Sequence, residues 1–317
     1  MIRSHTRVAA ASVRRNLVVA LLATFLLTPW LAGAAEKVEI KHAMGTALVP
    51  VKPTRIVAFD LSVLDNIDAL GVTGVQYAVP KQTMPGYLKK FLAADVVDAG
   101  GMKDPNLERI YEFGPDVIFI SARQTDYYDK LSAIAPTICT NVDYRDFLGG
   151  FETSMDILGR IFAIEDTAGA KTREIRAMAE SVKKKAEQSN RTAIIIMVND
   201  GAISAYGPGS RFGIVHDVLG VPPADPGIRV SNHGQSVDFE YLAKVNPDIL
   251  FVINRNVAIG TNGANGSSTV LDNELVQRTK AGKAGKIVNL DAAVWYLAGS
   301  GVQSIEIMIG EIDKALD

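Results

Sequence analysis

The segment IYEFGPDVIFISAR, from Ile110 to Arg123, recurs as LAKVNPDILFVINR, from Leu242 to Arg255, at a constant offset of 132 residues. Proline, aspartate, phenylalanine and arginine are identical between the copies, and the apolar pattern around them matches. Each copy predicts a helix that begins near Asp104 or its counterpart Ser236, then a Pro-Asp turn, a buried strand and a terminal arginine. The repetition indicates two related lobes.

Other apolar runs alternate with helical patterns along the chain. Leu61–Leu70 has helical spacing, and further apolar runs are typical of short strands: Arg55–Phe59, Ala193–Val198, Ile249–Ile253 and Ile287–Leu290. Continuous apolar strands separated by helices indicate parallel sheets that helices cover on both faces. The sequence therefore predicts an α/β fold.

The composition of Glu165–Ser189, between the two copies, favours one long helix. The segment is rich in alanine, lysine, glutamate and arginine, lacks proline and has Gly169 as its only glycine. At ~1.5 Å per residue such a helix spans about 35 Å, enough to bridge two lobes. We therefore expect two Rossmann-like lobes with parallel sheets, residues 36–163 and 190–317, joined by the helix 164–189, with a ligand in the cleft between them. The alternative is a single large domain with an ordinary surface helix.

The first 35 residues have the pattern of a removable signal peptide. Four arginines and an apolar run from Leu17 to Leu31 precede the small residues Ala32–Ala35. The apolar run is shorter than the roughly 20 residues of a membrane-spanning helix and leads into a cleavage-like site. We expect cleavage near Ala34 or Ala35 and export of the mature chain to the periplasm, by either the general or the twin-arginine route.

The composition of the mature chain excludes several functional classes. Without residues 1–35 it carries 29 lysines and arginines against 35 acidic residues, a formal charge near −6, which disfavours nucleic acid as a partner. Cys139 is the only cysteine, which excludes an internal disulfide framework and a zinc-cysteine cluster. The chain has no nucleophile elbow, phosphate-cradling loop or His-Glu-x-x-His pair, so we do not expect an enzyme.

Three arginines follow strands or turns at the sheet edge where open parallel sheets bind ligands. Arg123 and Arg255 end the repeated segments, one in each lobe, and Arg211 follows the glycine-rich turn Tyr206–Ser210. Guanidinium groups bind planar oxygen anions through paired hydrogen bonds, so three of them predict a positive pocket in an acidic protein. The competing interpretation is that each arginine is a solvated or ion-paired side chain.

Two further side chains are candidate ligands for ferric iron. His233 lies in the polar loop Ser231–Ser236, and Tyr296 follows the predicted strand Ile287–Leu290. Imidazole and phenolate both bind Fe³⁺, and phenolate is the harder donor. Taken singly, each residue is more often structural than a ligand.

Several motifs are specific enough to compare with known families. They are Ala122–Gln124, Ile134–Thr137, Ser210–Gly220, Asn232–Gly234, Asn254–Val257 and Trp295–Ala298. On these motifs the chain, from about Val38 to its end, resembles periplasmic ferric-siderophore-binding proteins with a helical backbone, of the enterochelin-uptake type.

This resemblance implies a role for each candidate at the cleft. Arg123, Arg211 and Arg255 would form a basic triad around an anionic ferric catecholate. His233 and Tyr296 would complete the iron shell where the siderophore supplies only four donor oxygens. Iron would be bound only as the siderophore complex, with no intrinsic cofactor.

The resemblance also implies a partner in the inner membrane. Glu108 and Glu240 match the surface glutamates, one per lobe, through which such proteins dock on an ABC permease. The competing interpretation is that both are ordinary acids on a helix surface. The mature protein is expected to be a monomer.

Three other functions remain open on the sequence. A haem or cobalamin carrier of the same fold would have a large apolar pocket and little need for three arginines. An exported enzyme that processes siderophores would cleave its ligand. A metal-ion binder would need more histidine and aspartate ligands than this cleft offers. The sequence does not identify which siderophore is carried.

Overall fold

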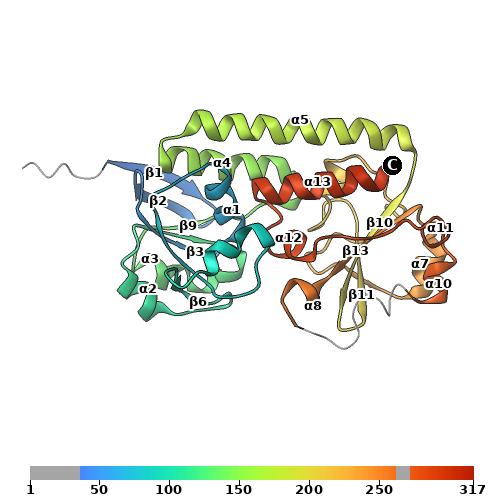
Figure 1. Ribbon diagram of the computed structural model, residues 1–317, viewed down its shortest axis with the longest axis horizontal. Coiled ribbons are helices and arrows are strands. Elements are labelled where there is room, and N and C mark those ends of the chain that lie inside the picture. Colours follow the sequence, from blue (N-terminus) through green and yellow to red (C-terminus); the bar gives the residue numbers. More distant parts are fainter. Residues whose placement is uncertain (1–35, 262–271) are drawn as a thin grey trace, which may run out of the picture. The chain divides into compact units, whose positions relative to one another are not determined.

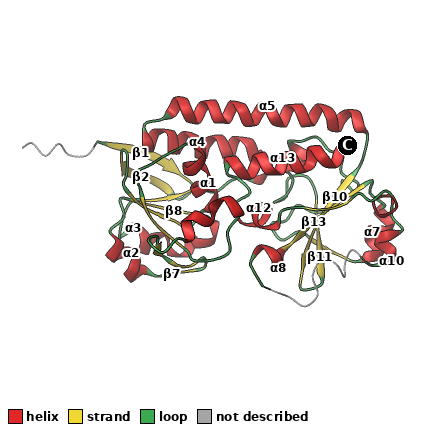
Figure 2. Ribbon diagram, viewed as in Figure 1, coloured by secondary structure: helices red, strands yellow, loops and turns green. Residues whose placement is uncertain are grey.

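The predicted strands lie in two five-stranded sheets, one in each lobe, in the computed structural model, which describes residues 36–261 and 272–317 (Figures 1 and 2). Residues Lys37–Asp317 form one compact unit. The predicted signal peptide lies outside the described residues. Within the described part of the chain, no helix combines the length and the apolar character needed to cross a membrane.

The N-terminal sheet is wholly parallel, as expected. Its spatial order is β5 (Val97–Asp98), β4 (Gln76–Val79), β3 (Arg55–Ala58), β8 (Val117–Ile120) and β9 (Thr137–Cys139). Every residue of β8 is buried, which explains why its sequence is an unbroken apolar run. Two short hairpins accompany this sheet: β1 (Lys37–His42) with β2 (Gly45–Pro50), and β6 (Gly100–Gly101) with β7 (Asp104–Pro105).

The C-terminal sheet is mixed and so differs from the parallel sheet expected. Its spatial order is β12 (Gln235–Val237), β11 (Ala202–Tyr206), β10 (Ala193–Asn199), β13 (Ile249–Asn254) and β14 (Ile287–Asn289). The strands β10, β13 and β14 are parallel, whereas β11 and β12 run antiparallel to their neighbours. The direction of β11 is due to the two-residue turn Asp200-Gly201, in which both residues have positive φ and which reverses the chain directly after β10.

Helices connect the strands of both sheets. In the N-terminal lobe they are α1 (Leu61–Ala69), η1 (Gly86–Leu92), α2 (Leu107–Phe113), η2 (Ala122–Tyr127), α3 (Tyr128–Ser132), η3 (Tyr144–Asp146) and α4 (Phe147–Phe162). In the C-terminal lobe they are α6 (Ile214–Asp217), α7 (Phe239–Val245), α8 (Arg255–Ala258), α10 (Glu274–Gln277), α11 (Lys280–Lys283) and α12 (Ala292–Leu297).

The long helix α5 spans Glu165–Ser189, the residues predicted for it, and packs alongside α4 and α13 (Val302–Leu316) (Figure 1). The last helix, α13, begins against the N-terminal lobe rather than its own. Asn66 accepts a hydrogen bond from the Val302 amide, and Asp65 accepts hydrogen bonds from the amides of Gln303 and Ser304. Side chains of α1 therefore cap α13 from the other lobe.

The two repeated segments fold in the same way. In both, a helix ends at a residue with left-handed backbone, Gly114 or Asn246, and a Pro-Asp turn leads into a buried strand. Asp116 accepts hydrogen bonds from the amide and hydroxyl of Thr54, and Asp248 makes the same pair of bonds with Thr192. Each turn thus ties its strand to the start of the neighbouring strand.

The helix starts lie two residues later than predicted. Asn106 and Asp238 cap α2 and α7 by accepting hydrogen bonds from the amides of Arg109 and Tyr241. Asp104 lies instead in the short strand β7, because the β6–β7 hairpin extends up to the helix. The offset of 132 residues still relates the two caps.

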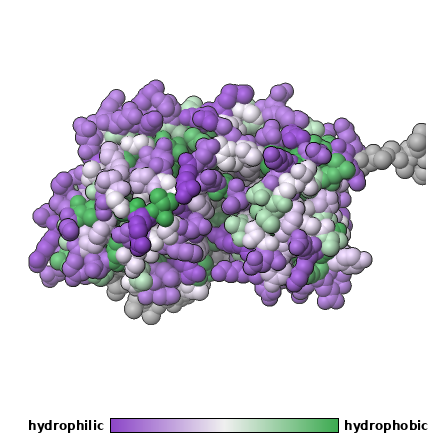
Figure 3. Space-filling model, turned by 180° about the vertical axis from the view of Figure 1, so that it is seen from behind, coloured by the Kyte–Doolittle hydropathy of each residue, from purple (hydrophilic) through white to green (hydrophobic). Residues whose placement is uncertain are grey.

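Apolar side chains on the described surface are scattered. The face seen in Figure 3 is mostly hydrophilic, with apolar residues in small separate groups. The exposed large apolar side chains of the described residues are Met44, Leu48, Tyr111, Met178, Val230 and Val257. Val230 lies beside the cleft between the lobes.

Candidate functional site

The strand or turn before each arginine places it at the cleft. Arg123 lies in the first turn of η2, directly after β8, where Ser121 and Gln124 form a capping box. Arg255 opens α8 directly after β13, and Asn254 caps that helix. Arg211 lies in the turn between β11 and α6. The carboxyl ends of the parallel strands β8 and β13 place Arg123 and Arg255, and the turn after the antiparallel strand β11 brings Arg211 to the same region.

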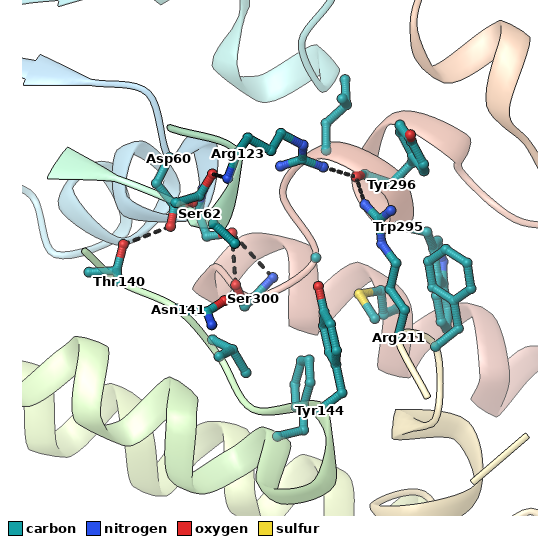
Figure 4. A pocket seen from close by; sticks show the side chains of 18 residues that line it. Asp60, Ser62, Arg123, Thr140, Asn141, Tyr144, Arg211, Trp295, Tyr296 and Ser300 are labelled. Atoms are coloured by element: carbon teal, nitrogen blue, oxygen red, sulfur yellow. Dashed lines mark hydrogen bonds between the residues drawn. The ribbon is translucent and has the colours of Figure 1, made fainter. Parts of the chain in front are cut away.

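A cavity of about 90 Å³ lies between the lobes at this point (Figure 4). Arg123 and Tyr144 enter it from the N-terminal lobe, and Arg211 and Tyr296 enter it from the C-terminal lobe. Its remaining polar lining consists of short side chains: Asp60, Ser62, Ser121, Thr140, Asn141 and Ser300. Both lobes thus contribute charged and aromatic groups to the same pocket.

Two of the arginines share one acceptor. Arg123 donates a hydrogen bond to the carbonyl oxygen of Tyr296 at 3.3 Å, and Arg211 donates to the same oxygen (Figure 4). The Arg211 guanidinium also lies 4.2 Å from the centroid of the Tyr296 ring, within cation–π range. An arginine from each lobe therefore meets at one residue of α12.

Arg255 is not among the residues that line the cavity, but it contacts the other end of the Tyr296 side chain. Its Nε donates to the Tyr296 hydroxyl at 3.0 Å, and its Nη1 donates to Asn199 at 2.9 Å. Burial favours the neutral phenol, but the hydrogen bond from Arg255 and the charges of Arg211, Arg255 and Arg123 outweigh it, so the pKa of Tyr296 is lowered. The three arginines thus favour the phenolate, the form that binds Fe³⁺.

The positive charge of the pocket is largely uncompensated. Among the described residues, none of the three arginines lies within ion-pair distance of a carboxylate. Burial and the nearby charge of Arg211 lower the pKa of Arg123. Asp60 is the one acid among the described residues that line the cavity, and its carboxylate already accepts hydrogen bonds from the Ser62 amide and the Thr140 hydroxyl. Such a pocket favours an anionic ligand.

Comparison with known proteins agrees with this architecture. Residues 56–294 match the family model described as periplasmic binding protein. The chain belongs to this family. Two curated relatives of this periplasmic binding protein are named for iron chelates. The petrobactin-binding protein YclQ of Bacillus subtilis is 42% identical over 89% of each chain. The ferric-anguibactin-binding protein FatB of Vibrio anguillarum is 32% identical over 94% of this chain and 97% of the FatB chain.

Solved structures show the same two-lobe fold. The crystal structure of YclQ superposes with a TM-score of 0.86 and covers 89% of this periplasmic binding protein and 99% of the YclQ chain. The periplasmic catecholate-siderophore-binding protein VctP of Vibrio cholerae is 33% identical, with a TM-score of 0.81 over 88% of this chain and all of its own, 100%. The predicted fold class is therefore confirmed.

The other predicted site residues lie apart from the cavity. His233 is exposed in the turn before β12 and does not line the cavity that holds Tyr296. Its backbone amide donates to Ser231. Glu108 and Glu240 are exposed in the first turns of α2 and α7, at equivalent places in the two lobes. The roles of all three remain predictions.

Asp60 and Tyr144 are among the lining residues of the cavity that were not predicted from the sequence. Asp60 lies two residues after β3, so the rule that identified Arg123 and Arg255 would also have found it. Tyr144 lies in η3, in the connection between β9 and α4, where no sequence motif indicated a site residue. Among the described residues, no group of three or more histidine, cysteine, aspartate or glutamate side chains is placed to hold a metal ion.

Proposed function

We propose that this periplasmic binding protein carries a ferric catecholate siderophore, unaltered, to the permease of an ABC importer. The observation that carries the proposal is the convergence of Arg123, Arg211 and Arg255 on Tyr296, with no carboxylate among the described residues at ion-pair distance from any of them. The names of YclQ, FatB and VctP support iron chelates as the ligand class. We further propose that the mature protein is a periplasmic monomer.

The charges give each side chain a role in binding. A ferric bis-catecholate is an anion whose coordinating oxygens accept hydrogen bonds from guanidinium groups. Arg123 and Arg211, which now donate to a backbone carbonyl, are oriented for this exchange. Tyr296, held toward its phenolate form by the arginines, would supply an oxygen to iron. His233 would be the second protein ligand once its loop turns toward the iron.

Fluorescence titration tests the ligand class. Trp295 is the only tryptophan of residues 36–317 and lines the cavity, so a bound ferric chelate should quench its emission. We expect quenching by ferric catecholates at far lower concentration than by ferric hydroxamates or haem. Equal affinity for all three would refute the proposal. Mass spectrometry of the released chelate should recover it intact, and cleaved fragments would indicate an enzyme instead.

Substitution of one arginine tests the pocket. Arg123→Gln should weaken binding roughly tenfold or more, the scale of one charge-assisted hydrogen bond. Arg278→Gln is the matched control, because Arg278 is an exposed arginine of the α10 region that is paired with Glu274. It changes the net charge equally and should leave binding unchanged. Equal effects of the two variants would show that only net charge matters.

The absorption spectrum tests the iron shell. Tyr296→Phe should remove the tyrosinate-to-iron charge-transfer contribution from the spectrum of a bound ferric bis-catecholate. His233→Ala should shift the same band without removing it. A spectrum and an affinity that are unchanged in either variant would exclude that residue from the iron shell.

Uptake assays test the docking residues. Glu108→Lys and Glu240→Lys should each impair siderophore-dependent uptake of iron into cells while leaving the Trp295 titration unchanged. Both glutamates are exposed, so neither charge reversal should disturb folding. Normal uptake by both variants would show that these acids are ordinary surface residues.

A further inference from the structure

Glu311 fastens the short helix that carries Tyr296. It lies in α13, and its carboxylate accepts hydrogen bonds from the Asp291 amide at 2.9 Å and from the Trp295 indole Nε1 at 2.6 Å. Asp291 is the cap of α12 and Trp295 lies within it, so the two donors are about one helical turn apart. Two bonds at that spacing fix α12 both along its axis and in rotation about it.

The helix α12 depends on support from neighbouring elements. It has only six residues, too few for a helix that is stable alone. Trp295 is 2% exposed and packs edge to face against Phe212, with 6.3 Å between the ring centroids. Trp295 and Tyr296 both line the arginine cavity (Figure 4). A shift of α12 would therefore move two walls of the cavity at once.

Glu311 lies on a helix that is anchored to the other lobe. The start of α13 is held by α1, where Asp65 accepts hydrogen bonds from the amides of Gln303 and Ser304. Ser304 and Glu311 are seven residues apart, about two turns of the same helix. Met308, which lies between them, also lines the cavity. One rigid helix and one carboxylate thus connect the N-terminal lobe to α12.

The Glu311 carboxylate is partly withdrawn from water. Burial raises its pKa, whereas the hydrogen bonds from Trp295 and the Asp291 amide lower it. Hydrogen bonds to a carboxylate are strong, and partial burial strengthens them further. Within the described residues, no lysine or arginine lies at ion-pair distance from Glu311. Its two oxygens therefore serve α12 rather than a cation.

We propose that Glu311 is a positioning residue for ligand binding, which holds α12 where Tyr296 meets the three arginines. The carbonyl of Tyr296 faces Arg123 and Arg211. Its hydroxyl faces Arg255. The inference rests on the proposed function and adds to it the group that keeps α12 in place when an anionic chelate draws the arginines away from the carbonyl.

Charge alone and positioning predict different effects of removing this carboxylate. Glu311→Gln takes an acid out of the lobe that carries Arg211 and Arg255, so by charge alone an anion should bind equally well or more tightly. The glutamine side chain offers only one acceptor for two donors, so α12 should shift. Positioning therefore predicts that a ferric bis-catecholate binds roughly tenfold more weakly, the lower end of the effect of losing a group that orients a metal ligand.

Equilibrium dialysis of the ferric bis-catecholate measures the affinity, because Glu311 contacts Trp295 and would disturb its fluorescence directly. Asp313→Asn is the matched control. It removes an acid from the same helix, but Asp313 bonds to Lys185 of α5 rather than to α12, so the affinity should be unchanged. The charge-transfer band of the bound chelate should move in Glu311→Gln toward the spectrum of Tyr296→Phe, a change that a loss of stability alone does not produce.

Trp295→Phe gives a second test, because it removes one of the two bonds and leaves the carboxylate in place. It should move the band in the same direction, and adding Glu311→Gln to it should cost less than tenfold, since one bond is already gone. An unchanged or higher affinity in Glu311→Gln, an unchanged band, or fully additive losses in the double variant would overturn the positioning role. Failure of the unsubstituted protein to bind the chelate would instead overturn the proposed function.

Discussion

Asp65 connects the two lobes, and its removal should destabilise the whole protein. The residue is fully buried in α1 and accepts hydrogen bonds from the Gln303 amide, the Ser304 amide, the Ser304 hydroxyl and the Tyr87 hydroxyl at 2.8–2.9 Å. Gly301 allows this approach, because a Cβ there would lie 2.3 Å from the Asp65 carboxylate. Asp65 thus satisfies two amides of the first turn of α13.

The size of the loss in Asp65→Ala follows from the donors that remain. The hydroxyls of Ser304 and Tyr87 already contact each other, so one of them can donate to the other when the carboxylate is gone. Two amides and one hydroxyl are then left buried without an acceptor. Each costs about 1 kcal/mol at the lower end of the range for such groups, so we expect the free energy of unfolding to fall by about 3 kcal/mol.

Chemical denaturation measures this change, with the free energy of unfolding extrapolated to zero denaturant. Asp68→Ala is the matched control, because Asp68 lies on the same helix but its carboxylate bonds, among the described residues, only to the side chains of Lys90 and Gln303. Its loss should cost less than about 1 kcal/mol, the value of an exposed ion pair. A loss below about 1 kcal/mol in Asp65→Ala would refute the idea that α1 caps α13.

Three further predictions concern charge and backbone. Asp60→Asn keeps an acceptor for the Ser62 amide but removes the acid of the cavity, so a ferric catecholate should bind roughly threefold more tightly by Trp295 quenching. Burial raises the pKa of Asp248, but hydrogen bonds from Thr192 and Lys280 and the charge of Lys280 lower it by more, so its pKa lies below 3.8. Its stabilising effect should therefore be present above pH 3.8 and be lost as the pH falls through the folded-state pKa. In acid titrations, the difference in unfolding free energy between the unsubstituted protein and Asp248→Asn should shrink over this pH range. Gly234→Ala should lower the free energy of unfolding by about 2 kcal/mol in the same denaturation assay, because Gly234 has a φ of +73° and a Cβ there would lie 2.8 Å from the Tyr206 ring.

The sequence predicted the features that depend on local pattern. The repeated Pro-Asp turn was recognisable because Asp116 and Asp248 perform the same task, the anchoring of a neighbouring threonine, in both lobes. The long helix Glu165–Ser189 was recognisable because it has neither proline nor an internal break.

The features that the sequence did not predict depend on contacts between distant segments. The capping of α13 joins residues more than 200 positions apart, Asp65 and Ser304, and neither carries a local signal for the other. The reversal of β11 follows from the Asp200-Gly201 turn, a hairpin signal that the expectation of a parallel sheet ignored.

The candidate site likewise contains residues that the local sequence pattern predicted and contacts that depend on how the lobes pack. Arg123 and Arg255 were found because a residue directly after a buried strand must lie at the sheet edge. Tyr296 was found near a strand end, but its contacts with all three arginines depend on how the lobes pack. His233 lies in a turn whose direction the strand pattern does not determine, and it stands apart from the cavity.

The arrangement of the arginines itself provides a driving force for binding. Arg123 and Arg211 come from different lobes and donate to one carbonyl, which brings two like charges together in a partly buried space. The lowered pKa of Arg123 reflects this burial and repulsion. An anionic chelate that takes over both hydrogen bonds would replace repulsion with attraction. Because α5 and the capping of α13 by α1 hold the lobes together, we expect this exchange to need only small shifts of the lobes.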